Sequence, residues 1–105
     1  MIGFLKNLFS AGPDVDYAEM VANGAQIIDV RTPMEYKGGH IKGSVNIPLD
    51  SLQRNLSKIN KNKPVITCCA SGMRSAQAKN LLKSSGFQDV YNGGSWIKVQ
   101  QWVKG

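Results

Sequence analysis

The chain has 105 residues, of which 42% are hydrophobic and 19% are charged, so it holds one globular domain and is neither disordered nor a coiled coil. Its formal net charge of +6 suits an anionic ligand or an acidic partner, but a basic surface that only aids solubility would look the same. One histidine and two adjacent cysteines are too few for a disulfide scaffold or a four-ligand zinc site, and the apolar runs are too short to span a membrane.

Residues 1–13 are predicted to form an N-terminal segment ahead of a domain over residues 14–105. The apolar start resembles a secretory signal, but Lys6 interrupts it and no cleavage site of small residues follows. We therefore expect this segment to pack on the domain.

Short helical patterns then alternate with short apolar runs. A helix is predicted over residues 16–23, capped by Asp16, and is followed by a strand at residues 26–30. The run Thr-Pro-Met-Glu at residues 32–35 combines a cap, a proline at the first helical position and the glutamate of a capping box, so a short helix is expected there. Residues 44–47 are the second strand candidate.

The second half of the chain continues the alternation. Apolar residues spaced by three and four predict a helix over residues 50–59, with Asp50 as its cap. A buried strand at residues 64–68, a helix over residues 75–86 and a short strand at residues 89–91 follow.

The chain is then expected to turn at residues 92–94 and to enter a final helix capped by Ser95. Strands separated by helices of this length need crossover connections. We therefore predict an α/β fold with a mainly parallel sheet covered by helices on both faces.

The candidate reactive group is a cysteine at the carboxyl end of the strand at residues 64–68, where sites form in open parallel sheets. Small residues at 70–72 lead into a helix, so unpaired backbone N–H groups can converge on a thiol there and lower its pKa. Arg74 adds a cation that can hold an oxyanion. Because side chains alternate along a strand, only one of Cys68 and Cys69 can face this loop. A small, buried core cysteine is the alternative interpretation.

Several segments resemble motifs of the rhodanese family. Residues 28–36 and 39–48 resemble the first motif of the family, residues 65–75 resemble its active-site loop, and residues 93–96 resemble its closing motif. The resemblance implies a rhodanese-like α/β domain with a central sheet of about five strands. It also implies a sulfurtransferase that moves a sulfane sulfur from thiosulfate to cyanide or a thiol through a cysteine persulfide, without a cofactor or metal.

The resemblance further assigns roles to single residues. Cys69 is the expected nucleophile, and Asp29 and Arg31 are expected to tie loops together near the site, with Arg31 pairing with Glu35. His40 is interpreted as a structural hydrogen-bonding residue and not as a base. The residues expected to bind the donor and the persulfide are Ala70, Ser71, Gly72, Met73, Arg74 and Ser75.

The adjacent cysteines leave the register of the loop open. Counted from Cys69 the loop is Cys-x4-Arg, as in the sulfurtransferases that the chain resembles, whereas from Cys68 it is Cys-x5-Arg, as in related phosphatases and arsenate reductases. The strand reaches its expected length only if Cys68 belongs to it, which favours Cys69. Cys68 is then interpreted as a bystander and not as a resolving thiol, because a disulfide between adjacent cysteines is strained.

Three functions follow from these alternatives. The first is a sulfurtransferase that uses free thiosulfate, and the second is a sulfur-relay module that takes persulfide sulfur from one protein and passes it to another. The third, least favoured, is a phosphatase or arsenate reductase that uses Cys68. We expect a small anionic donor and a thiophilic acceptor as partners, no nucleic acid, and a cytoplasmic location, because a reactive thiol needs a reducing compartment.

Overall fold

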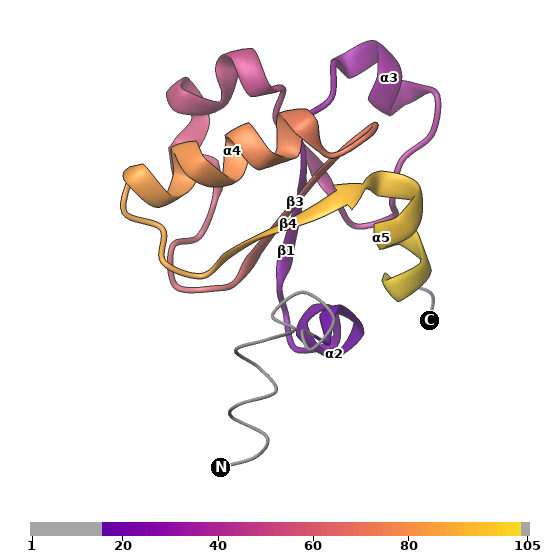
Figure 1. Cartoon of the computed structure of the whole chain (residues 1–105), viewed down its shortest axis with the longest axis horizontal. Helices are drawn as coiled ribbons and strands as arrows, with labels where there is room; N and C mark the ends of the chain where they lie inside the picture. Colours follow the sequence, from indigo (N-terminus) through magenta and orange to yellow (C-terminus); the bar gives the residue numbers. More distant parts are fainter. Residues whose placement is uncertain (1–15, 104–105) are drawn as a thin grey trace.

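The computed structural model describes residues 16–103, in which helices and strands alternate (Figure 1). The predicted segment at residues 1–13 lies outside the described residues. None of the helices described is long and apolar enough to cross a membrane. The elements in chain order are α2 (Tyr17–Ala22), β1 (Gln26–Asp29), α3 (Pro33–Lys37), β2 (Val45–Asn46), the 3-10 helix η1 (Leu49–Lys58), β3 (Val65–Cys69), α4 (Met73–Ser84), β4 (Val90–Ser95) and α5 (Trp96–Val103).

The strands form one parallel sheet in the order β2-β1-β3-β4. This confirms the α/β fold and each of the four strand segments expected from the sequence. The described residues form four strands, where the family resemblance implied about five. Asp29 lies opposite Cys68 in the register, so the carboxyl ends of β1 and β3 share one edge of the sheet.

Helices cover both faces of the sheet, as predicted. Figure 1 shows α4 and η1 together on one face and α2 with α5 on the other, in agreement with the contacts between these elements. β3 lies between the two layers and is buried along its whole length. Its side chains alternate between two apolar cores, because Val65 and Cys69 join the core beneath α4 whereas Ile66 and Cys68 join the core beneath α5.

The caps of the first two helices form as expected. The carboxylate of Asp16 accepts a hydrogen bond from the N–H of Glu19 at the start of α2. At α3, the Thr32 hydroxyl accepts from the N–H of Glu35 while the Glu35 carboxylate accepts from the N–H of Thr32, which completes the capping box.

Two elements differ from the prediction. The helix expected from residue 50 is a 3-10 helix that begins after Pro48, so Asp50 lies inside its first turn and is not its cap. It is kinked at Asn55, whose side-chain amide donates to the carbonyl of Ser51 and competes with the helical hydrogen bonds.

The second difference is in β4. The expected turn at residues 92–94 is a continuation of this strand to Ser95, with an irregularity in its pairing opposite Thr67 and Cys68. Residue 93 is a glycine, and because it has no side chain the strand can pass close to the core. As expected, the Ser95 hydroxyl accepts a hydrogen bond from the N–H of Ile97 at the start of α5.

Candidate active site

The loop between β3 and α4 curls around the sulfur of Cys69. β3 ends at this cysteine, and Gly72 caps α4 with a φ of 109°, in the left-handed region that suits a residue without a Cβ. This conformation directs backbone donors at the sulfur: the N–H of Gly72 lies 2.9 Å from Sγ and the N–H of Ser75 lies 3.3 Å from it. The sulfur therefore sits at the positive end of α4, where a negative charge is favoured.

These contacts decide the ionisation of the thiol. Burial of Cys69, which is only 1% exposed, opposes the charged form. The hydroxyl and N–H of Ser75 and the N–H groups of Gly72 and Ser71 outweigh this effect and lower the pKa of the Cys69 thiol below its ordinary value. A thiolate is the nucleophilic form of cysteine, so the lowered pKa makes Cys69 the candidate nucleophile.

Ser75 connects the sulfur to a residue that the sequence did not indicate. The Cys69 thiol donates to the Ser75 hydroxyl at 3.4 Å, and this hydroxyl donates to the side-chain oxygen of Asn92 at 2.6 Å. When Cys69 is a thiolate, the same hydroxyl can turn its proton to the sulfur, which is how it lowers the pKa of Cys69. The side-chain oxygen of Asn92 also accepts from the N–H of Gly94, so Asn92 anchors the first turn of α4 to β4. Asn92 was expected in a turn, and nothing in its local sequence pointed to the site.

Cys68 lies on the other side of the strand. Its side chain belongs to a separate core cluster with four apolar residues, and burial there raises the pKa of the Cys68 thiol far above its ordinary value. The hydrogen bonds of the loop thus reach Cys69, and the alternation expected for the two cysteines is confirmed. The companions of Cys68 in this cluster are Ile27, Ile41, Ile66 and Val99.

Asp29 and Arg31 form a buried ion pair at the end of β1. The carboxylate accepts from Nε and Nη2 of Arg31, the latter at 2.7 Å, and both side chains are at most 5% exposed. Nη2 also donates to the carbonyl of Gly39, and the guanidinium lies 4.5 Å from the ring of Trp96. Arg31 therefore joins β1, the segment after α3 and the start of α5.

The expected pairing of Arg31 with Glu35 is wrong. Arg31 reaches only the backbone carbonyl of Glu35, because the nearer, buried Asp29 occupies its guanidinium. The carboxylate of Glu35 instead accepts two hydrogen bonds from Arg74, at 2.8 and 3.1 Å. Arg74 and the N–H of Thr32 lower the pKa of Glu35 to about 2. The pKa of Arg74 is raised, chiefly by its hydrogen bonds to this carboxylate and in part by the charge of Cys69.

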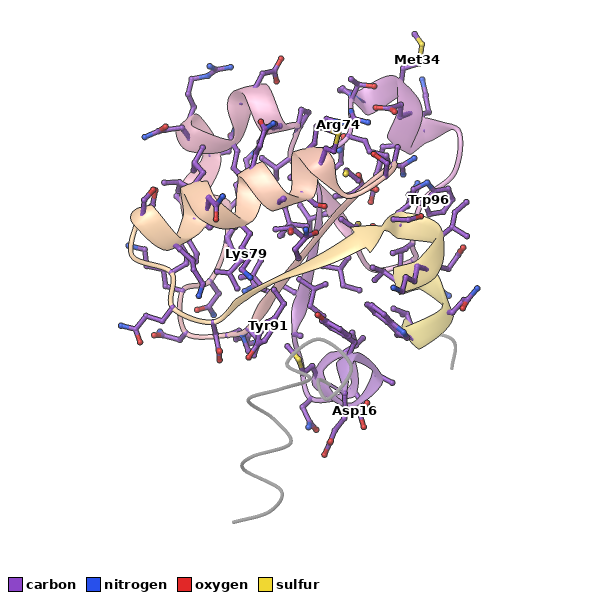
Figure 2. The ribbon with its side chains drawn as sticks, in the orientation of Figure 1. Asp16, Met34, Arg74, Lys79, Tyr91 and Trp96 are labelled. Carbon is purple, nitrogen blue, oxygen red and sulfur yellow. The ribbon has the colours of Figure 1, made fainter. Side chains whose placement is uncertain are left out.

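The surroundings of this second ion pair are open. Figure 2 shows Arg74 at the start of α4, at the same end of the molecule as Met34. A cleft of about 470 Å³ adjoins it, with apolar walls from Val30, Pro33, Pro48 and Leu49 and polar atoms from Thr32, Asp50 and Arg74.

The remaining predicted residues lie on the loop after β3, at the start of α4 or, in the case of His40, on the segment after α3. Ala70 and Ser71 are exposed at the tip of the loop, and the Met73 side chain, 73% exposed, points to solvent. His40 is hydrogen-bonded through Nδ1 to the carbonyl of Tyr36 and its ring stacks on the Tyr36 ring, which agrees with the structural role expected for it.

Comparisons with known proteins show which family this chain resembles. A family model described as a rhodanese-like domain matches residues 14–96. The uncharacterized protein YqhL of Bacillus subtilis is 44% identical over 68 residues, which are 65% of this chain and 54% of that protein. The thiosulfate sulfurtransferase PspE of Escherichia coli is 38% identical over 69 residues, which are 64% of this chain and 66% of PspE. The chain thus spans about half of YqhL and two thirds of PspE.

A solved structure shows the same fold. The structure described as rhodanese with anions from E. coli superposes with a TM-score of 0.65 at 35% sequence identity, covering 71% of this chain and 91% of that one.

Proposed function

Since this chain belongs to the rhodanese-like domain family and is related to sulfurtransferases, we propose that it transfers a sulfane sulfur through a persulfide on Cys69. One observation carries the proposal: the N–H groups of Gly72 and Ser75 point at the Cys69 sulfur at the start of α4. Such a cradle stabilises a negative charge on that sulfur, and the same donors suit the terminal sulfur of a persulfide anion.

The reaction divides into two displacements on sulfur. In the first, the Cys69 thiolate attacks the outer sulfur of thiosulfate, a sulfur–sulfur bond forms, and the bond to the sulfonate breaks, so that sulfite leaves with the electron pair. In the second, cyanide or a thiolate attacks the outer sulfur of the persulfide and the Cys69 thiolate is restored. Between the steps the negative charge lies on the outer sulfur of the persulfide, where the loop N–H groups stabilise it, and Arg74 faces the incoming donor.

Cys69 is the proposed nucleophile, and Cys68 is not. The Cys68 thiol lies among apolar side chains with its pKa raised, and no hydrogen bond from the loop reaches it. A phosphatase or arsenate reductase on Cys68 would need these donors on the other face of β3. We place the activity in a reducing compartment such as the cytoplasm, with a small anionic donor and a thiophilic acceptor.

The proposal is tested by intact mass after the reduced protein is incubated with thiosulfate. We expect wild type and the matched control Cys68→Ser to gain one sulfur atom that cyanide removes, and Cys69→Ser to gain none. Uptake that depends on Cys68 would overturn the assignment of the nucleophile. If thiosulfate adds no sulfur but a protein persulfide does, the relay function replaces the free-donor reaction.

A further inference from the structure

The two arginines at this end of the sheet are both paired with carboxylates. Arg31 is bound by Asp29 in the interior, and Arg74 is bound by Glu35 at the mouth of the loop. The second pair has side chains 34% and 37% exposed, and Arg74 is the neighbour of Ser75, whose N–H contacts the Cys69 sulfur, so the pair is accessible to solvent close to that sulfur. The Arg74 charge that the donor would use is therefore already compensated.

Glu35 is held in this position from two sides. Its Oε1 accepts from the N–H of Thr32 at 2.9 Å and from the Thr32 hydroxyl at 3.1 Å, as part of the capping box of α3. The same oxygen accepts from Nη1 of Arg74 at 2.8 Å, and Oε2 accepts from Nη2. The capping box therefore holds the carboxylate beside Arg74 independently of the ion pair.

This arrangement separates donors by their charge. Thiosulfate carries two negative charges, and a carboxylate beside the cationic group that should receive it opposes the second charge as strongly as the first. Because Glu35 offsets the attraction of Arg74 for each donor charge, a sulfane donor with one negative charge loses half as much attraction as thiosulfate does. Its transferable sulfur can still reach the N–H groups of Gly72 and Ser75 around the Cys69 sulfur.

We propose that Glu35 sets the donor preference of the site: its pairing with Arg74 disfavours a doubly charged donor and favours a singly charged sulfane donor, such as a thiosulfonate or a persulfide. The inference rests on the proposed sulfur transfer and names the class of donor for the same site. Glu35 acts here as a specificity-determining residue and takes no part in bond formation.

Two donors of nearly equal shape test this preference. In the methanethiosulfonate anion, a methyl group replaces one oxygen of thiosulfate and removes one charge. The Cys69 thiolate attacks the outer sulfur of either donor, and sulfite or methanesulfinate leaves with the electron pair of the broken sulfur–sulfur bond. The second-order rate constant of sulfur uptake is measured by intact mass at quenched times, with no acceptor present.

The variant is Glu35→Gln, which keeps an acceptor for the capping box because glutamine also serves at that position. The matched control is Glu19→Gln, which removes the same charge from an exposed residue of α2. Figure 2 shows Asp16, at the start of α2, at the opposite end of the molecule from Arg74. We expect Glu35→Gln to raise the thiosulfate-to-methanethiosulfonate ratio of rate constants about tenfold, the size expected for one unit charge acting on another in partly solvated surroundings, and Glu19→Gln to leave it unchanged.

The ratio separates this inference from the proposed function. Both donors are measured on one preparation, so a loss of folded protein lowers both rates equally and leaves their ratio unchanged. Two results would overturn the role of Glu35 without affecting sulfur uptake itself. In the first, the ratio in Glu35→Gln stays within a factor of two of the wild-type ratio. In the second, the ratio rises as much in Glu19→Gln as in Glu35→Gln. No uptake from either donor in wild type would overturn the proposed reaction with free donors, and the donor preference with it.

Discussion

Gly93 lies where β4 passes closest to the core, and Gly93→Ala should destabilise the fold strongly. A Cβ at this position would lie 2.7 Å from Cγ2 of Val99, 2.9 Å from Cγ2 of Ile66 and 2.9 Å from the carbonyl oxygen of Thr67. Val99 and Ile66 are fully buried, and the carbonyl belongs to the central strand, so none of the three can move away freely. Overpacking of this kind costs about 1–3 kcal/mol, and the backbone contact puts the expected loss at about 3 kcal/mol.

Urea unfolding measures this loss. With a dependence of about 2 kcal/mol per molar urea, typical of a small domain, the midpoint should fall by about 1.5 M. The matched control is Gly38→Ala, because Gly38 has a φ of −74° and its new Cβ would meet no atom closer than 3.5 Å. The control should be as stable as wild type or more stable by about 0.4–1 kcal/mol. A midpoint for Gly93→Ala within about 0.3 M of wild type would refute the packing argument.

Two further predictions concern the site. Ser75→Ala should raise the pKa of the Cys69 thiol, so that the pH midpoint of its alkylation by iodoacetamide moves up while the rate at high pH is kept; an unmoved midpoint would show that the backbone N–H groups alone hold the thiolate. Arg31→Ala should leave the Asp29 carboxylate buried without its partner and cost about 3–5 kcal/mol in urea unfolding, whereas a loss below about 1 kcal/mol would mean that water reaches that carboxylate.

The pKa of Cys69 also gives a direction for stability against pH. Its pKa is lower in the folded chain than in the unfolded chain, so ionisation of Cys69 stabilises the fold at pH values above the ordinary thiol pKa. This contribution is lost as the pH falls through the lowered pKa of the folded state. Ser75→Ala should reduce it.

Local signals predicted much of the fold. The caps at Asp16 and Thr32 each depend on residues within one turn of the chain, and the apolar runs of the strands are continuous, so short windows contain the whole signal. The loop after Cys69 could be predicted for the same reason, because the end of the strand, the small residues and the start of the helix follow one another directly in the sequence.

Features that depend on distant contacts were not predictable in this way. Gly93 looked like part of a turn, but its place beside Ile66 lets β4 continue through it. Glu35 is four residues from Arg31, which suggested a local pair, yet its partner is Arg74, 39 residues away. Asn92 reaches Ser75 from a different strand, and nothing in the sequence around either residue reports that contact.

The opposite orientation of the neighbouring cysteines bears on how long a loaded sulfur can be kept. A dithiol whose members face each other can expel a persulfide as hydrogen sulfide by closing a disulfide. Cys68 and Cys69 belong to separate cores on the two faces of β3, so the Cys68 sulfur cannot reach the inner sulfur of a Cys69 persulfide, which it would have to attack to close that disulfide. If Cys69 carries a persulfide, as proposed, the other cysteine of the chain cannot release its sulfur. Release of the sulfur then requires an external acceptor at the loop, so the lifetime of the persulfide depends on the rate at which the protein meets that acceptor.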